Sequence, residues 1–379
     1  MSDYIVSARK YRPSTFFEVV GQEQVSETLK KALNSGKLAQ SFLFCGPRGV
    51  GKTTCARILA KAINCENPTP EKEPCNQCNS CMSFAQNASF NMFELDAASN
   101  NSVDDIRILV DQVRFPPQSG KYKVYIIDEV HMLSSGAFNA FLKTLEEPPS
   151  YAIFILATTE KHKIIPTILS RCQIFDFKRI SNEDIVKQLE HIATQENITT
   201  ESSALHIIAE KADGGMRDAL SLFDKIVSFA GDKVSYQDVI SNLNILDYDY
   251  YFNIINYLIA EDNTATLIAF NEIIKNGFDG EIFINGLANH CRNLLLCKDE
   301  ATLALLEVGE DLKLKYQEQA QIIPETFLLN ALNILNQCDV EYKTAKNKRL
   351  LVEMALLKLC FLNQQIEQTL SLLLGEKKN

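Results

Sequence analysis

The residues best placed to do chemistry form a glycine-rich loop in the N-terminal part of the chain. Residues 46–53 read Gly-Pro-Arg-Gly-Val-Gly-Lys-Thr, a complete G-x-x-x-x-G-K-[ST] pattern. The glycines of such a loop let backbone N–H groups turn inward around phosphates, Lys52 would reach the β- and γ-phosphates, and Thr53 would offer its hydroxyl to Mg²⁺. We expect a nucleotide to bind to this loop and to the start of the helix that follows it, through Gly46, Gly49, Val50, Gly51, Lys52, Thr53 and Thr54.

Two adjacent carboxylates are the second candidate for chemistry. Asp128 and Glu129 end an apolar run about 75 residues after Thr53. Asp128 fits the carboxylate on the metal side of a nucleotide site, and Glu129 fits the group that orients or deprotonates the attacking water. On its own, an acidic pair at a strand end is more often a solvated turn. Together with the phosphate-binding loop, the pair indicates that the bound nucleotide is hydrolysed.

Four cysteines form a third candidate site, with the spacing C-x9-C-x2-C-x2-C. Cys65, Cys75, Cys78 and Cys81 lie within seventeen residues that are otherwise rich in loop-forming Asn and Pro. Four thiolates suit tetrahedral Zn²⁺, and four protein ligands leave no open position, so the expected role is structural. An iron–sulfur cluster and a redox C-x-x-C pair are the alternatives. The other seven cysteines lie singly, mostly in apolar patterns, and are expected to be small buried hydrophobic residues.

The elements that must position these residues change in type along the chain. Continuous apolar runs at 41–45, 123–128 and 151–158 are separated by helical patterns, and such runs suit strands buried on both faces of a parallel α/β sheet. After about residue 180 the runs stop, and apolar positions recur every three to four residues. We expect an α/β domain, a small helical domain and a larger helical domain at residues 1–180, 181–243 and 244–379.

Composition and charge narrow the class of protein. Apolar residues make up 46% of the 379 residues, and eleven cysteines without a secretion signal favour a reducing compartment, with the cytoplasm as the expected location. No apolar run is long enough to span a bilayer. Residues 1–180 carry 21 Lys and Arg against 18 Asp and Glu, whereas residues 181–379 carry 17 against 30. Contacts to a phosphate backbone are therefore expected from the first half. The acidic second half is equally well explained by solubility.

Further motifs resemble those of a known family. The phosphate loop and the Asp-Glu-Val-His sequence at 128–131 resemble the motifs of AAA+ ATPases, and the Ala-Arg-Lys-Tyr-Arg-Pro sequence at 8–13 and the Val-Gly-Gln sequence at 20–22 resemble the N-terminal motifs of one family within that class. Within that class, the chain resembles the gamma/tau subunits of bacterial DNA polymerase III from about residue 4 to at least residue 245. The basic stretch at 9–13 would otherwise be an exposed turn. The resemblance instead implies an adenine pocket lined by Tyr11, Arg12, Pro13 and Val20.

The same resemblance assigns three more polar side chains to the nucleotide. Thr159, or alternatively Thr158, looks like the sensor that hydrogen-bonds the γ-phosphate or the attacking water, although a threonine at a strand end is usually structural. Arg171 belongs to a Ser-Arg-Cys motif and would be an arginine finger inserted into a neighbouring subunit's site. Arg217 would contact the nucleotide from the lid, or would be a solvated residue in a first helical turn.

The resemblance also implies an architecture and a function. The fold would be an AAA+ P-loop module with a parallel sheet and a zinc insert at 65–81, followed by a helical lid domain and an all-α C-terminal collar. The implied function is a motor that binds and hydrolyses ATP with Mg²⁺ and carries Zn²⁺. In a ring-like heteropentamer of clamp-loader subunits, it would load the sliding clamp onto primer–template DNA within the polymerase holoenzyme. It would have no nucleotidyl-transfer chemistry of its own and no membrane association.

Three questions stay open at this stage. Small polar residues at 96–102 precede a helix whose N-terminus could hold a DNA phosphate, but capping by Ser102 explains them equally well. Another AAA+ machine, such as a branch-migration ATPase, is disfavoured by the Ser-Arg-Cys motif and the zinc insert. A subunit that binds ATP without turning it over is disfavoured by intact Lys52, Asp128, Glu129 and Arg171. The chain is also expected to lack the long extension of tau-type chains, and the sequence leaves open whether it is a natural short form or a piece of a longer protein.

Lys52→Ala should abolish ATP binding and leave the zinc content intact, because the ammonium group is the main phosphate contact and lies outside the cysteine cluster. ATP affinity by equilibrium binding and zinc by elemental analysis measure the two effects. Normal ATP hydrolysis by Lys52→Ala would show that the nucleotide site has been assigned wrongly.

Overall fold

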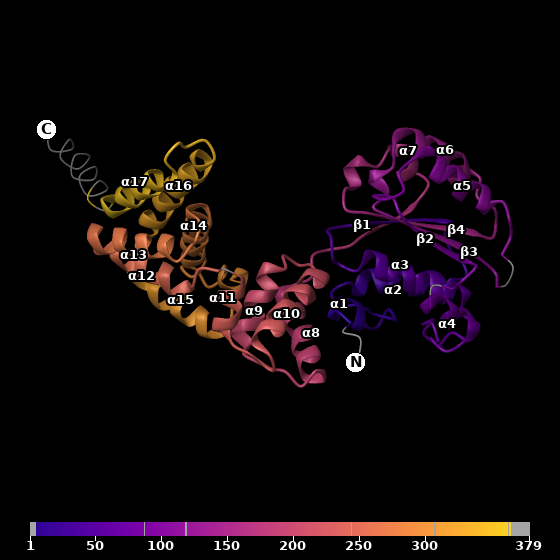
Figure 1. Cartoon of the computed structure of the whole chain (residues 1–379), viewed down its shortest axis with the longest axis horizontal. Helices are drawn as coiled ribbons and strands as arrows, with labels where there is room; N and C mark the ends of the chain where they lie inside the picture. The colour runs from indigo at the N-terminus through magenta and orange to yellow at the C-terminus, as the bar shows by residue number, and fades with distance from the viewer. Residues whose placement is uncertain are drawn as a thin grey trace. The chain divides into compact units, whose positions relative to one another are not determined.

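The computed structural model describes residues 5–86, 88–117, 120–243, 245–306, 308–362 and 364. Contacts between residues divide the chain into two compact units. The first unit contains Met1–Thr200 and Leu205–Val234, and the second contains Glu201–Ala204 and Ser235–Asn379. The first unit is built around a β-sheet, and the second consists of helices (Figure 1).

A five-stranded parallel sheet forms the centre of the first unit, in the order β2-β3-β4-β1-β5. The strands are β1 (Ser41–Cys45), β2 (Met92–Asp96), β3 (Lys123–Asp128), β4 (Ala152–Thr158) and β5 (Gln173–Asp176). Every residue of β1 and β4 is buried, which is why their sequences are continuous apolar runs. The predicted parallel α/β sheet is confirmed. The edge strands β2 and β5 are only partly buried, and their sequences did not predict them.

Helices cover both faces of this sheet (Figure 1). Phe42 and Phe44 of β1 pack with α2 (Glu23–Ser35) and α3 (Lys52–Asn64), whereas the alternate residues of β1 pack against the opposite face. That opposite face is covered by α5 (Val103–Val113), α6 (Ser135–Glu146) and α7 (Pro166–Leu169). Two hydrophobic clusters, one on each face, therefore hold the sheet in place.

The rest of the first unit consists of the short helices α1 (Ser7–Lys10) and α4 (Asn79–Ala85) and a group of helices after residue 180. This later group comprises α8 (Asn182–Gln195), α9 (Ser202–Lys211) and α10 (Met216–Ala230), with the small strands β6 (Thr199–Thr200) and β7 (Lys233–Val234). Ser181 caps α8 by accepting from the backbone N–H of Asp184 at 3.2 Å. The unit boundary at Val234 falls inside the expected 181–243 segment, whose limits remain a prediction.

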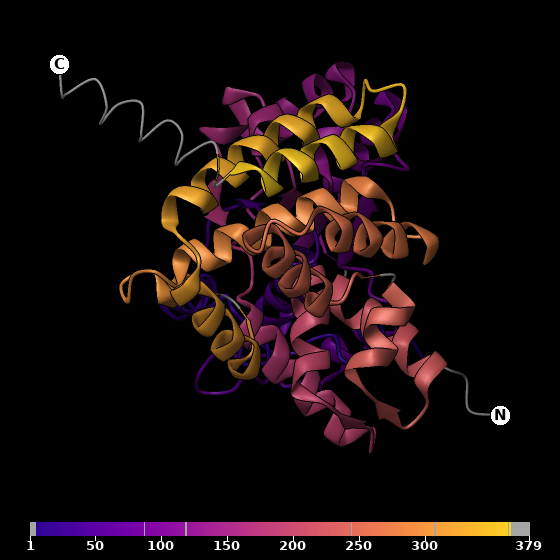
Figure 2. The same cartoon turned by 90° about the vertical axis from the view of Figure 1, so that its left-hand side faces the viewer.

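The second unit packs its helices around one hydrophobic cluster (Figure 2). Its helices are α11 (Tyr236–Leu243), α12 (Tyr248–Ile259), α13 (Asn263–Lys275), α14 (Gly280–Leu296), α15 (Glu310–Ile322), α16 (Glu325–Tyr342) and α17 (Lys348–Cys360). Inside this unit, His290 lies 3.0 Å from the Tyr316 hydroxyl and 2.9 Å from Gln319 Oε1, and burial lowers the pKa of His290 to about 4. The imidazole is therefore neutral near pH 7. In the described part of the chain, no helix is both long and apolar enough to cross a membrane.

Phe154→Ala should lower the free energy of unfolding of the first unit by about 3–5 kcal/mol. Phe154 is fully buried in β4, with its ring centre 5.4 Å from that of Tyr125 and 5.2 Å from that of Phe141, so truncation leaves a cavity. Phe115 is 67% exposed in the same unit, and Phe115→Ala should change the free energy by less than about 0.5 kcal/mol. Chemical denaturation of the two variants measures the difference, and equal effects would contradict the assignment of the core.

Candidate nucleotide and metal sites

The phosphate-binding loop connects the end of β1 to α3 in backbone conformations that suit glycine. Gly46 has φ 149°, and a Cβ atom there would lie 2.5 Å from the carbonyl oxygen of Phe177. Gly51, the N-cap of α3, has φ 102° in the left-handed region. The loop therefore turns sharply from a buried strand into a helix, and a helix N-terminus at the end of such a loop is a favourable place for an anion.

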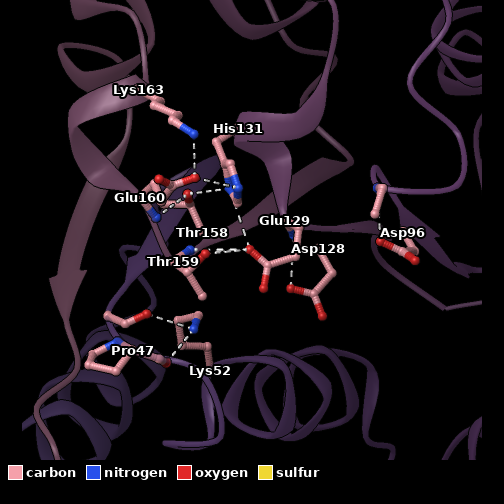
Figure 3. Close-up of polar contacts among 12 residues, drawn as sticks. Pro47, Lys52, Asp96, Asp128, Glu129, His131, Thr158, Thr159, Glu160 and Lys163 are labelled. Atoms are coloured by element: carbon pink, nitrogen blue, oxygen red, sulfur yellow. Dashed lines mark hydrogen bonds and ion pairs between the residues drawn. The ribbon is translucent and has the colours of Figure 1, made fainter. Parts of the chain in front are cut away.

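Lys52 and Thr53 lie at this N-terminus, and both are bonded to groups of their own chain. The Lys52 side chain is buried, and its Nζ donates to the carbonyl oxygens of Gly46 at 2.7 Å and Pro47 at 2.6 Å (Figure 3). Burial lowers the pKa of Lys52, while the nearby carboxylates of Glu129 and Asp128 act in the opposite direction. The Thr53 hydroxyl donates to Asp128 Oδ2 at 2.7 Å. Hydroxyl and carboxylate oxygens side by side fit the oxygen ligands that Mg²⁺ prefers.

Glu129 begins the turn after β3 and is bonded to Thr159 after β4. Glu129 has φ 47°, a conformation that non-glycine residues adopt rarely and mainly at functional sites. Its Oε2 accepts from the Thr159 backbone N–H at 3.2 Å and from the Thr159 hydroxyl at 3.0 Å (Figure 3). Thr158 is fully buried, and its hydroxyl lies 3.0 Å from His131 Nδ1. Of the two threonines, Thr159 is therefore the one beside the carboxylate.

A cavity of about 540 Å³ joins these groups to the N-terminal segment and to helices α8 and α10. This volume is within the usual range for small-molecule sites. The expected residues that line it are Tyr11, Arg12, Pro13, Val20, Gly49, Val50, Gly51, Lys52, Thr53, Thr54, Asp128, Glu129 and Arg217. The sequence interpretation missed Val19, Ile180, Gln188, Met216 and Leu220, which also line it. Met216 and Leu220 are one helical turn apart on α10, and sequence alone could not show that this face meets the cavity.

Charged and polar groups hold the N-terminal segment, residues 7–20, against the end of α8. The Tyr11 hydroxyl and the Lys10 ammonium both bond Glu196, and these two contacts keep the pKa of Glu196 below its ordinary value. The pKa of Arg12 is lowered by partial loss of hydration and by the neighbouring charges of Arg57 and Arg217. Guanidinium groups gathered beside the cavity favour a polyanionic ligand such as a triphosphate.

Gly46, Thr159 and Arg171 are the expected nucleotide-site residues that do not line the cavity. Arg171 follows α7, with its side chain 33% exposed. Its guanidinium donates to Glu146 Oε1 at 2.7 Å and to the Thr167 carbonyl oxygen at 2.8 Å. An arginine that serves a neighbouring subunit needs to be accessible and away from its own chain's site, and this position meets both conditions. The role itself stays a prediction.

The four expected metal ligands come together in the structure. The sulfur atoms of Cys65, Cys75, Cys78 and Cys81 all lie within 4.8 Å of one another. Tetrahedral zinc with Zn–S bonds of about 2.3 Å needs sulfurs roughly 3.8 Å apart, so a small adjustment suffices. The backbone N–H groups of Gln77 and Cys78 lower the pKa of Cys75 to about 6, whereas burial raises the pKa of Cys65 and of Cys81. These contacts fit zinc, and sulfur ligands also suit an iron–sulfur cluster.

A buried glutamate attaches the cysteine loop to the rest of the first unit. Glu73 Oε2 accepts from the backbone N–H of Phe16 at 2.7 Å, and Glu73 Oε1 lies 2.6 Å from Lys30 Nζ. The sequence interpretation missed Glu73, because a charged residue within a loop is usually solvated. The cysteine loop is therefore bound to α2 and to the N-terminal segment, several of whose residues line the nucleotide cavity.

The N-terminus of α5, considered for a DNA phosphate, is capped by its own chain. The Ser102 hydroxyl accepts from the Asp105 N–H at 3.2 Å, and Asp105 Oδ2 accepts from the Ser102 N–H at 3.1 Å. This reciprocal capping box accounts for the small polar sequence. Asp104 and Asp105 in the first turn add negative charge, which does not favour a phosphate.

Three family models match consecutive parts of the chain. Residues 21–181 match "DNA polymerase III, delta subunit", residues 184–232 match "DNA polymerase III clamp loader subunit, ATPase lid domain", and residues 234–372 match "DNA polymerase III subunits gamma and tau domain III". Together the three models run from the strand-rich part of the chain to its last helices.

Individual proteins are similar over most of this chain. DNA polymerase III subunit tau of Bacillus subtilis is 44% identical and that of Escherichia coli 39% identical, each over 94% of this chain. The chain spans only 63% and 55% of those two relatives. DNA polymerase III subunit gamma of Buchnera aphidicola is 34% identical over 94% of this chain and 98% of its own length. The Thermotoga maritima RuvB branch migration motor aligns with a TM-score of 0.46, 17% identity and 82% and 90% coverage, too distant for any argument.

Cys78→Ser should reduce bound metal by about one equivalent per chain and expose the loop at 65–81 to proteolysis, because the loop has few apolar residues to order it without a metal. Cys297→Ser is the matched control, since that thiol lies in the second unit outside the cluster. Elemental analysis identifies the metal, and limited proteolysis reports the order of the loop. Unchanged metal content in Cys78→Ser would contradict the assignment of the ligands.

Proposed function

Because the chain belongs to the gamma and tau subunit family of bacterial DNA polymerase III, we propose that it is an ATP-driven motor subunit of a clamp loader. As an AAA+ ATPase, it would open a sliding clamp and place it on primed DNA within the polymerase holoenzyme. The observation that carries this proposal is the convergence of three groups at one edge of the sheet. These are the phosphate loop, the Thr53–Asp128 pair and the Glu129–Thr159 pair.

In this proposal the residues of the cavity have different roles in ATP hydrolysis. Lys52 and the loop N–H groups hold the β- and γ-phosphates, and Thr53 and Asp128 hold Mg²⁺, which would neutralise charge on the phosphate oxygens. Glu129 orients the attacking water and accepts its proton. Thr159, one hydrogen bond away from that carboxylate, donates to the water or to the γ-phosphate.

The adenine would occupy the part of the cavity between the N-terminal segment and the lid. Pro13, Val19 and Val20 supply apolar surface from one side, and Ile180 and Leu220 supply it from the other. Arg217, near the start of α10, would contact the phosphates from the lid. ATP bound between these groups would draw α10 toward the sheet, and loss of the γ-phosphate would release it, as in hinge-type transitions.

The remaining parts have assembly and structural roles in this proposal. Arg171 acts in the site of a neighbouring subunit, where an arginine in trans can accelerate hydrolysis roughly 10³–10⁵-fold. The helical segment 244–379 is the collar of a hetero-oligomer, with segments 1–180 and 181–243 as the ATPase and lid domains. Zinc in the cysteine cluster orders the loop at 65–81, and the cytoplasm is the proposed location.

The test is the rate of ATP hydrolysis by the chain assembled with clamp-loader partner subunits, with and without sliding clamp and primer–template DNA. We expect stimulation by clamp and primed DNA together. Arg171→Ala should remove it with a loss of roughly 10³-fold in rate, while ATP affinity stays unchanged. Arg114→Ala is the matched control, because the Arg114 side chain is 74% exposed and pairs with Asp111 at the end of its own helix.

Two results would contradict parts of this proposal. A hydrolysis rate indifferent to clamp and DNA would leave only a generic AAA+ ATPase. If clamp and primed DNA stimulate hydrolysis equally in the wild type and in Arg171→Ala, Arg171 has no intersubunit role. The clamp-loading function would then still stand.

A further inference from the structure

His131 lies between two carboxylates at the edge of the proposed hydrolysis site. Its side chain is only 6% exposed. Nδ1 lies 3.4 Å from Glu129 Oε2, and Nε2 lies 3.0 Å from Oε2 of Glu160 (Figure 3). The ring is also fixed by the Thr158 hydroxyl, 3.0 Å from Nδ1, and that same hydroxyl accepts from the Glu160 backbone N–H at 3.0 Å. A buried imidazole with three polar neighbours has little freedom to change its orientation.

The contacts continue from Glu160 to the molecular surface. Lys163 Nζ donates to Glu160 Oε2 at 2.7 Å, which keeps the pKa of Glu160 below its ordinary value and the carboxylate ionised. Lys163 ends the short turn Lys161–Lys163, and its side chain is 51% exposed. Glu129, His131, Glu160 and Lys163 therefore form a continuous chain of polar contacts from the cavity to an exposed basic turn (Figure 3).

The small number of hydrogen-bond donors near Glu129 makes the neighbouring His131 ring important for the position of its carboxylate. The Thr159 hydroxyl has one hydrogen, which it directs at Glu129. When that hydrogen is donated to a phosphate oxygen or to the attacking water, Oε2 of Glu129 keeps the Thr159 backbone N–H as its donor. The His131 ring, with Nδ1 3.4 Å from Oε2, stays beside the carboxylate and limits how far it can turn. The backbone at Glu129 is set by the turn that follows it, because Met132 N–H donates to the Glu129 carbonyl oxygen at 2.8 Å. The side-chain direction then depends on the Thr159 backbone N–H and on the His131 ring beside the carboxylate.

We propose that His131 is a positioning residue that holds Glu129 in line for hydrolysis and links it, through Glu160, to Lys163 in the exposed turn. This inference rests on the proposed ATPase function and adds a route by which a change in the turn alters the hydrolysis rate without altering ATP affinity. His131 does not line the nucleotide cavity, so it acts through Glu129.

The first experiment separates ATP binding from hydrolysis in His131→Ala, with the full chain assembled with its partner subunits. The single-turnover rate should fall on the order of tenfold, since misplacing a catalytic group by a fraction of an ångström has effects of that size or larger. The Kd for a fluorescent ATP analogue with Mg²⁺ should stay within about twofold. His131→Gln should recover part of the rate, because its amide can still donate to Glu160. His191→Ala is the matched control, because that imidazole is exposed on α8 and lies 2.9 Å from Gln195 of the same helix.

The second experiment tests the link to the surface with a double-mutant cycle. Lys163→Ala should change the single-turnover rate by about threefold without changing Kd, and the change should disappear when His131 is also replaced. Lys163 is half exposed, so this variant is expected to fold even if His131→Ala does not. Additive effects in the cycle would refute the link, and an unchanged rate in His131→Ala would refute the positioning role. If the wild-type assembly hydrolyses no ATP, the proposed function itself fails, and this inference fails with it.

Discussion

The parallel pairing of the sheet is the constraint on which the nucleotide site depends. In a parallel sheet all strands end at the same edge, so the loops after β1, β3 and β4 must converge there. The register makes this convergence close. Cys45 pairs with Thr158, and the next N–H along, from Gly46, donates to the Thr158 carbonyl oxygen at 3.2 Å. The phosphate loop and Thr159 are neighbours for this reason, although more than a hundred residues separate them in the sequence.

Burial of the strands on both faces is what makes the edge rigid enough to hold charged groups. The two hydrophobic clusters leave β1, β3 and β4 almost no exposed residues, so their ends move little relative to one another. Buried Lys52 and partly exposed Asp128 and Glu129 are consequently held close together at this edge. Each is costly to desolvate alone, and their opposite charges and hydrogen bonds offset part of that cost. The same arrangement accounts for the bonded pairs Thr53–Asp128 and Glu129–Thr159.

Elements outside the sheet depend on different forces. The loop that carries the four cysteines has little apolar sequence to bury, and its order comes from sulfur ligands and from the buried contacts of Glu73. The lid helices are bound to the N-terminal segment by a few polar contacts, such as that of Ser7 N–H with Asp224 at 2.7 Å. A small number of polar contacts is easier to rearrange than a packed core, which suits elements that respond to a nucleotide.

The sequence by itself determined the features that depend on local order along the chain. The glycine spacing in the phosphate loop, the acidic pair after an apolar run and the close spacing of the cysteines each require residues near one another in sequence. The buried strands β1, β3 and β4 were predictable because burial on both faces makes every residue apolar. The edge strands β2 and β5 are only partly buried and lack a continuous apolar run, so the sequence alone did not predict them.

Only the tertiary structure decided which distant side chains meet. The sequence cannot distinguish the roles of the adjacent residues Thr158 and Thr159. In the structure, side chains alternate about the end of the strand, so Thr158 points toward His131 and Thr159 toward Glu129. Glu73, Ile180 and Leu220 were missed for a related reason, since their partners come from segments far along the chain. Periodicity shows which face of an element is apolar or polar. It does not show what that face will contact, because that depends on how the elements pack.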